Sequence, residues 1–170
     1  MTNQVVNSAK KHFLTGLDTL SHVLDVSIDA LKSEGDAILD YRLIGDMLPF
    51  GTQIVFTCNQ PRNFSRWCEG LTMENLPPEV ESLDQVVQII SDTRDELVKA
   101  EASDSKLQEA YRVDLVDPQY LELCGFDYID EFLIPNFYFH LVTAYNIMRM
   151  KGVPLGKANY VPHLVAKIKQ

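Results

Sequence analysis

The chain has 170 residues, of which 46% are hydrophobic and 23% are charged. This length suits one well-cored domain and is too short for two comfortable ones. Lys and Arg number 15 against 24 Asp and Glu, which gives a formal net charge of −9. An acidic balance argues against partners such as nucleic acid or an anionic membrane, since both favour a basic surface. We expect a single domain over residues 1–170, with 151–170 as a C-terminal tail.

The cysteines and the N-terminus bear on the compartment. Cys58, Cys68 and Cys124 are an odd number of thiols without CxxC spacing, and MTNQVVNSAKKHF contains no apolar leader segment. No stretch of the chain approaches the length and apolarity of a membrane span. We therefore expect a cytoplasmic protein with reduced thiols. Cys58 and Cys68 are interpreted as small hydrophobic residues rather than reactive ones.

Apolar residues at helical spacing predict two long helices in the first part of the chain. The first helix carries one stripe of about five turns and ends before Gly35, and Asp36 can cap the next helix. The second is expected from about Ala37 toward Trp67, with Pro49 kinking it and Pro61 breaking or bending it again. The first stripe consists of Phe13, Leu17, Leu20, Leu24, Ile28 and Leu31. The second consists of Leu39, Leu43, Met47, Phe50, Ile54 and Cys58.

A third helix and a hairpin are predicted next. After the loop Glu74–Glu81, apolar residues between Leu83 and Leu97 mark a helix with an acidic outer face. Alternating apolar residues on either side of Asp117-Pro118 then predict a short β-hairpin. Between Glu74 and Glu109 there are ten acids and three bases, whereas the last 22 residues carry five bases and no acid. The basic tail could lean on the acidic helix face.

The fourth predicted helix runs from about Asp127 to Met150 and is apolar nearly all round, which implies burial on most sides. The following segment VPLGKANYV is expected to be extended or irregular. Four helices of this length, three of them with amphipathic stripes, predict an all-α fold, an antiparallel four-helix bundle with a short β-hairpin before the last helix. The aromatic residues Phe137, Tyr138 and Phe139 are interpreted as core, as is Trp67.

Three polar residues interrupt the apolar fourth helix. Asn136, His140 and Thr143 are spaced so that they share one face. Each would need a partner, water or a ligand, because an unpaired buried polar group costs about 1–3 kcal/mol. Histidine can bind a metal or carry a proton, and the asparagine oxygen suits hard cations. A lone histidine on an apolar face is nevertheless more often a satisfied core residue.

The second predicted helix offers possible partners for this stripe. Asp46 is in register with Leu43 and Phe50, so we expect it to point inward or nearly so. An ion pair with Arg42, four residues earlier, explains it equally well. Gln53 lies beside the same stripe and could orient a ligand, or it could simply bond to a neighbouring carbonyl. These residues predict a small polar cavity between the second and fourth helices.

The segments PNFYFHLVTAYNIMRMKGVPLGK and RLIGDMLPFGTQI resemble two motifs of a bacterial and fungal family described only as a domain of unknown function. The order of elements also matches over nearly the whole chain. That family is grouped with the DinB/YfiT-like four-helix bundles. Many members of the wider group bind a divalent metal through three histidines, one from the second helix and an HxxxH pair from the fourth, and some are transferases, isomerases or hydrolases.

The resemblance implies that Asn136 and His140 stand where the HxxxH pair would be, with asparagine replacing the first histidine. Asp46 is the best candidate for the ligand from the second helix. One imidazole, one carboxylate and one amide make a weaker and harder site than three imidazoles. We therefore expect either a pocket with a divalent metal held by His140, Asn136 and Asp46, oriented by Gln53 or Thr143, or a metal-free bundle. The metal-free bundle would bind a small molecule or form a homodimer. The residues do not decide whether the protein is an enzyme.

Overall fold

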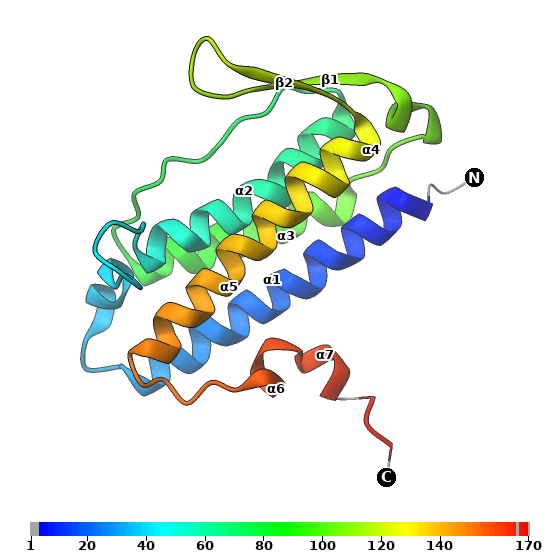
Figure 1. Cartoon of the computed structure of the whole chain (residues 1–170). Helices are drawn as coiled ribbons and strands as arrows, with labels where there is room; N and C mark the ends of the chain where they lie inside the picture. Colours follow the sequence, from blue (N-terminus) through cyan, green and yellow to red (C-terminus); the bar gives the residue numbers. More distant parts are fainter. Residues whose placement is uncertain (1–3, 166, 170) are drawn as a thin grey trace.

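The computed structural model describes residues 4–165 and 167–169. Its four long helices are α1 (Gln4–Ala30), α2 (Phe50–Glu69), α3 (Leu83–Lys99) and α5 (Ile134–Met150). They lie roughly alongside one another in a bundle, with the hairpin at one end and the C-terminal segment beside α1 and α5 (Figure 1). The most extensive helix–helix contact joins α2 and α5. The predicted all-α bundle with a hairpin is confirmed.

The interior of the bundle is formed largely by the predicted stripes. The first four residues of the α1 stripe are at most 1% exposed, and Phe137 of α5 is fully buried. Gly16 allows α5 to approach closely, since a Cβ atom there would collide with the Phe137 ring. Residues buried in this way contribute about 1.5–3 kcal/mol each, which makes the apolar faces the main source of stability.

The second helix begins thirteen residues later than predicted. Gly35–Asp40 forms a short 3-10 helix, residues 41–49 are irregular, and α2 starts at Phe50 after the extended Pro49. A residue that precedes proline is disfavoured in the helical region, so Leu48 and Pro49 mark a helix start rather than a kink. Pro61 lies within α2 and does not end it. The helix ends at Gly70, whose φ of 80° is left-handed.

The loop between α2 and α3 is held by polar side chains of α2. Asn63 donates to Asn75 Oδ1 at 2.8 Å and accepts from the Glu74 N–H at 2.9 Å. Asn59 accepts from the Leu76 N–H at 2.9 Å, and Thr52 donates to the Pro78 carbonyl at 3.0 Å. The backbone of this loop is thus satisfied by a helix rather than by a strand partner.

The predicted acidic helix α3 is confirmed. Asp36, which was expected to cap the second helix, lies at the start of α3 instead. Ser82 is the N-cap of α3 and accepts from the Gln85 N–H, while Asp36 accepts from the Leu83 N–H at 2.8 Å. Asp36 therefore caps α3 rather than the helix that follows it in sequence. On the outer face of α3, Glu96 forms an ion pair with Arg62 of α2 at 2.8 Å.

The hairpin consists of β1 (Ala110–Asp114) and β2 (Tyr120–Cys124), which pair antiparallel with Val113 opposite Leu121. It follows the short 3-10 helix η2 (Asp104–Gln108). A continuous helical run then begins with α4 (Gly125–Asp127), passes through the π-helical turn η3 (Tyr128–Leu133) and continues as α5. Pro135 stands in the first turn of α5, directly after this π-helical turn, and the helical run continues through it.

The C-terminal segment differs from the prediction. Residues 153–156 are extended, but α6 (Lys157–Tyr160) and α7 (Pro162–Val165) are short helices. Thr19 of α1 donates to the Tyr160 carbonyl at 3.0 Å, and the rings of Tyr145 and Tyr160 are 5.7 Å apart. The described residues of the tail therefore pack on α1 and α5 rather than on the acidic α3. Among the described residues, no helix is both long and apolar enough for a membrane span.

Candidate functional site

A polar pair joins the two helices that share the largest contact. His140, in the middle of α5, lies with its Nδ1 2.8 Å from Oε1 of Gln53 in the first turn of α2. The amide nitrogen of Gln53 donates to the Leu48 carbonyl at 3.2 Å. The amide nitrogen thus points toward Leu48 and Oε1 toward the imidazole, and because an amide oxygen can only accept, the imidazole donates from Nδ1–H. The lone pair of the neutral ring then resides on Nε2.

Two phenylalanine rings frame the imidazole. Phe56 of α2 and Phe139 of α5 meet it edge to face, with centroids 5.2 and 5.1 Å away and interplanar angles of 84°. Burial disfavours the charged imidazolium and lowers the pKa of His140 from 6.5 to about 4. His140 is therefore a neutral imidazole at pH 7. It is only half-buried, so the pair lies at the edge of the α2–α5 interface.

The other polar residues of the predicted stripe bond to their own helix. Asn136 donates to the Phe132 carbonyl at 2.6 Å, and Thr143 donates to the Phe139 carbonyl at 2.7 Å. The Phe132 carbonyl lies three residues before Pro135, which has no N–H and so leaves a gap in the backbone hydrogen bonds of the helix. Asn136 and Thr143 thus share a face with His140 as predicted, while their hydrogen bonds are local.

Asp46 does not lie where the sequence pattern suggested. It is an exposed residue of the irregular segment 41–49, so the prediction that it points inward from a helix is wrong. The helical register with Leu43 and Phe50 does not exist, because the helix begins only at Phe50. Arg42 bonds to the Met47 carbonyl instead. The α2 side chain that meets His140 is Gln53.

The side chains around His140 do not fit the three-histidine metal centre that the resemblance implies. One imidazole is present, its Nδ1 is bonded to Gln53, and the two nearby carboxamides are weak ligands for zinc or nickel. Over residues 4–165 and 167–169, no three His, Cys, Asp or Glu side chains lie close enough to hold a metal ion.

Two of the three cysteines carry thiols that burial makes poorly reactive. Burial raises the pKa of both the Cys58 and the Cys68 thiol to about 12. Thiols with such pKa values stay protonated at neutral pH and react poorly. All three cysteines are free. Cys58 is fully buried in the hydrophobic core and Cys68 packs against it, which is the environment expected for small hydrophobic residues.

The sequence did not predict several residues that surround the His140–Gln53 pair or that hold the loop after α2. Phe56 was outside the predicted stripes, and only its position three residues after Gln53 places it beside the pair. Phe139 was expected in the core but is 58% exposed. Asn59 and Asn63 are buried in α2, and their signal was the polar amides recurring four residues apart opposite the apolar stripe.

The fold, four helices in a bundle with a hairpin before the last one, is that of a DinB-like four-helix bundle. A crystal structure of a DinB family member from Shewanella denitrificans is similar to this chain, with a TM-score of 0.71 and 25% sequence identity. The likeness covers 92% of this chain and 88% of the other.

Within that class, the model of the family described as domain of unknown function DUF1993 matches residues 7–161. The chain belongs to this family. No curated protein gives a significant match. The predicted family resemblance is confirmed, and neither the description of the family nor that of the similar crystal structure names a reaction.

Proposed function

We propose that the protein is a metal-independent binding bundle whose ligand contacts the His140–Gln53 pair. The observation that carries this proposal is the 2.8 Å bond between His140 Nδ1 and Gln53 Oε1. This bond fixes the tautomer and leaves Nε2 as a hydrogen-bond acceptor. A half-buried acceptor with aromatic neighbours is the kind of polar group that orients ligands in largely apolar sites.

The chemistry of the pair favours an uncharged ligand. A neutral imidazole nitrogen accepts a hydrogen bond from an amide, a hydroxyl or a protonated heterocycle nitrogen. The edges of Phe56 and the exposed ring of Phe139 offer an apolar wall for the rest of the molecule. The ligand class is therefore a small neutral donor with an aromatic or aliphatic body.

Catalysis by His140 has less support than binding. A general base works best when its pKa lies near the working pH, whereas burial lowers the pKa of His140 to about 4. The alternative is a metal pocket in which His140 and Asn136 act as ligands. It predicts stoichiometric divalent metal in untagged protein that disappears in His140→Ala.

A fragment titration followed by NMR tests the binding proposal. Small amides, phenols and azoles should perturb the backbone signals of Gln53 and His140, and His140→Ala should abolish the response. Asn146→Ala is a matched control because Asn146 is an exposed polar residue of the same helix. Perturbations that persist in His140→Ala, or metal that copurifies at one equivalent, would contradict the proposal.

Self-association through the outer face of α5 is a second candidate. Phe139 is 58%, Met150 49% and Val142 38% exposed, although large apolar side chains usually avoid water when they cluster. A homodimer would cover this face. Light scattering should then give twice the chain mass for the wild type and a monomer for Phe139→Glu; a monomeric wild type at high concentration rejects it.

We also propose a cytoplasmic location. Three free cysteines in a chain of this size support a reducing compartment. Cell fractionation of the native protein tests this, and recovery from an oxidising compartment would contradict it.

A further inference from the structure

A cavity of about 380 Å³ lies between α1, α5 and the C-terminal segment, on a different face of α5 from the His140 site. Lys11, His12 and Thr15 of α1 line it together with Tyr138 of α5. The C-terminal segment adds His163, Leu164 and Lys167. Tyr138 and His140 are two residues apart on a helix, so their side chains point about 200° apart. The two sites are thus separate.

The charge of this cavity is opposite to that of the whole chain. Two lysines and two histidines line it, and the described lining residues include no carboxylate. The chain as a whole carries −9. The chain has 15 basic and 24 acidic residues, so a cavity lined by basic residues differs from the acidic chain as a whole. Such a surface attracts anions and repels cations.

The C-terminal wall of the cavity is anchored by the segment just before it. Tyr160 is held by Thr19 through a 3.0 Å hydrogen bond, and Asn159 lies 3.0 Å from His22 Nε2. These bonds fix α6 on α1, and α7 with His163 follows directly. The cavity therefore exists because the tail folds back onto α1.

The polar groups at the base of the cavity are paired with one another. His12 Nδ1 lies 3.3 Å from the Tyr138 hydroxyl, and the two rings meet edge to face with centroids 6.5 Å apart. This contact joins α1 to α5 and holds both rings in place. It leaves the second ring nitrogen of His12 for another partner.

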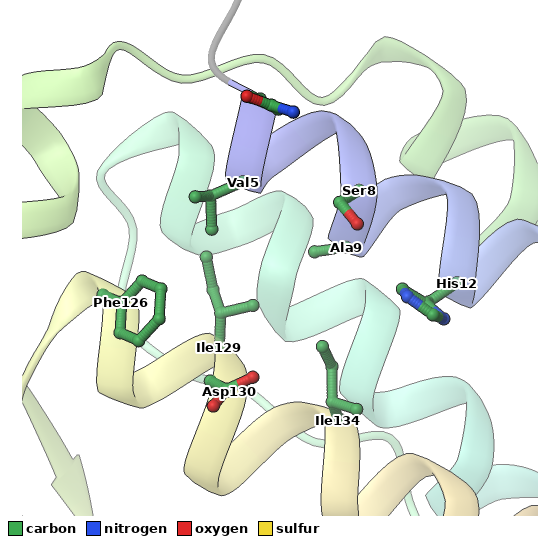
Figure 2. A pocket seen from close by; sticks show the side chains of 9 residues that line it. Val5, Ser8, Ala9, His12, Phe126, Ile129, Asp130 and Ile134 are labelled. Carbon is green, nitrogen blue, oxygen red and sulfur yellow. The ribbon is translucent and has the colours of Figure 1, made fainter.

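A second hollow of about 290 Å³ shares Ser8 and His12 with the basic cavity. Figure 2 shows Val5 and Ala9 of α1 across from Ile129 and Ile134, with His12 at one end of the hollow. Asp130 also lines this hollow, so it disfavours an anionic group there. The two hollows adjoin at Ser8 and His12, and the pair is called the groove below, with a basic end and a largely apolar end.

We propose that this groove binds a small amphipathic anion. Its phosphate or carboxylate group would contact Lys11 and Lys167, with the Thr15 hydroxyl as a further donor, and its apolar body would lie along Ala9 and Ile134. The combined volume is in the range of small-molecule pockets. No metal and no residue of the His140 site takes part.

Calorimetric titration at low salt tests the proposal with hexyl phosphate, hexanoate, hexanol and inorganic phosphate. We expect one or both amphipathic anions to bind at least about tenfold more tightly than hexanol and inorganic phosphate, because only they use both ends of the groove. Comparison of hexyl phosphate with hexanoate identifies the head group. The variant Lys11→Gln/Lys167→Gln should weaken this binding by about tenfold or more.

The control variant is Lys32→Gln/Lys99→Gln, which loses the same two charges at exposed positions outside the groove. It should bind like the wild type. Binding that is equal in both double variants, or absent for both amphipathic anions at millimolar concentration, overturns the proposal. Hexanol binding as tightly as the anions would also overturn it, since the basic end would then have no role.

Discussion

On one side of α2, Asn59 and Asn63 hold the loop that follows the helix; on the other side, Gln53 meets His140 of α5. The asparagines bond to backbone N–H groups, which always require a partner. On the α5 side, the Gln53 and His140 side chains bond to each other, and Nε2 of His140 can still accept a hydrogen bond. The difference teaches that buried polar residues of one helix can spend their bonding capacity on the backbone of a loop or on a side chain that keeps a further acceptor.

The largest effect is expected on the loop side. Asn63→Ala removes the acceptor for the Glu74 N–H and the donor to Asn75, so the free energy of unfolding should fall by about 2 kcal/mol. Urea denaturation measures this. Asn75→Ala, whose side chain is exposed, is the control and should cost about half as much or less. Equal losses in both variants would mean that Asn63 does not organise the loop.

A smaller effect is expected on the α5 side. Gln53→Ala should lower the free energy of unfolding by about 1 kcal/mol, because the Leu48 carbonyl and the half-buried imidazole lose a partner that water can partly replace. A double-mutant cycle with His140→Ala should give a coupling of about 0.5–1.5 kcal/mol. Strictly additive losses would contradict a direct bond between the two side chains.

The pH dependence of stability sharpens the same side of the comparison. Because the folded-state pKa of His140 lies at about 4, below its usual 6.5, the unfolded chain takes up this proton first as the pH falls. Stability should be unaffected above about pH 6.5 and should fall between pH 6.5 and 4. Partial exposure limits the loss to about 1–2 kcal/mol.

The variant His140→Phe serves as the control for this titration. It should show a smaller loss of stability over the same interval, since only the other titrating groups remain. A profile identical to that of the wild type would mean that His140 is not held in its neutral form.

The smallest effect is expected at the surface of the loop side. Arg66 and Glu74 form an ion pair at 2.8 Å, with Glu74 largely exposed. Glu74→Gln should change the free energy of unfolding by no more than about 0.5 kcal/mol, because water screens the pair. Arg66 also donates to the Thr72 carbonyl at 2.8 Å. A loss above about 1 kcal/mol in Glu74→Gln would show that the charge itself secures the loop.

The sequence predicted those parts of the fold that depend on periodic apolar residues. The helices α1 and α3 and the presence of a hairpin around Asp117-Pro118 follow directly from spacing. The start of α2 was mispredicted because Leu43 and Met47 extend the helical period by coincidence into an irregular segment, where Pro49 sets the true boundary. That shift also misplaced Asp46.

The candidate site was predictable only in part. Polar interruptions in an apolar helix pointed to His140, and the neighbouring helix supplied Gln53. Which hydrogen bonds those side chains make depends on helix rotation, which spacing alone does not fix. The basic groove was not predictable, since it requires a tail that folds back onto α1 rather than onto α3.

The most direct test of the account is the imidazole ¹⁵N spectrum of His140 as zinc is added. The bond to Gln53 predicts a neutral ring protonated on Nδ1, with an Nε2 signal that stays unchanged through one equivalent of Zn²⁺. A ring protonated on Nε2, or an Nε2 signal that shifts stoichiometrically with zinc, would contradict the metal-independent site.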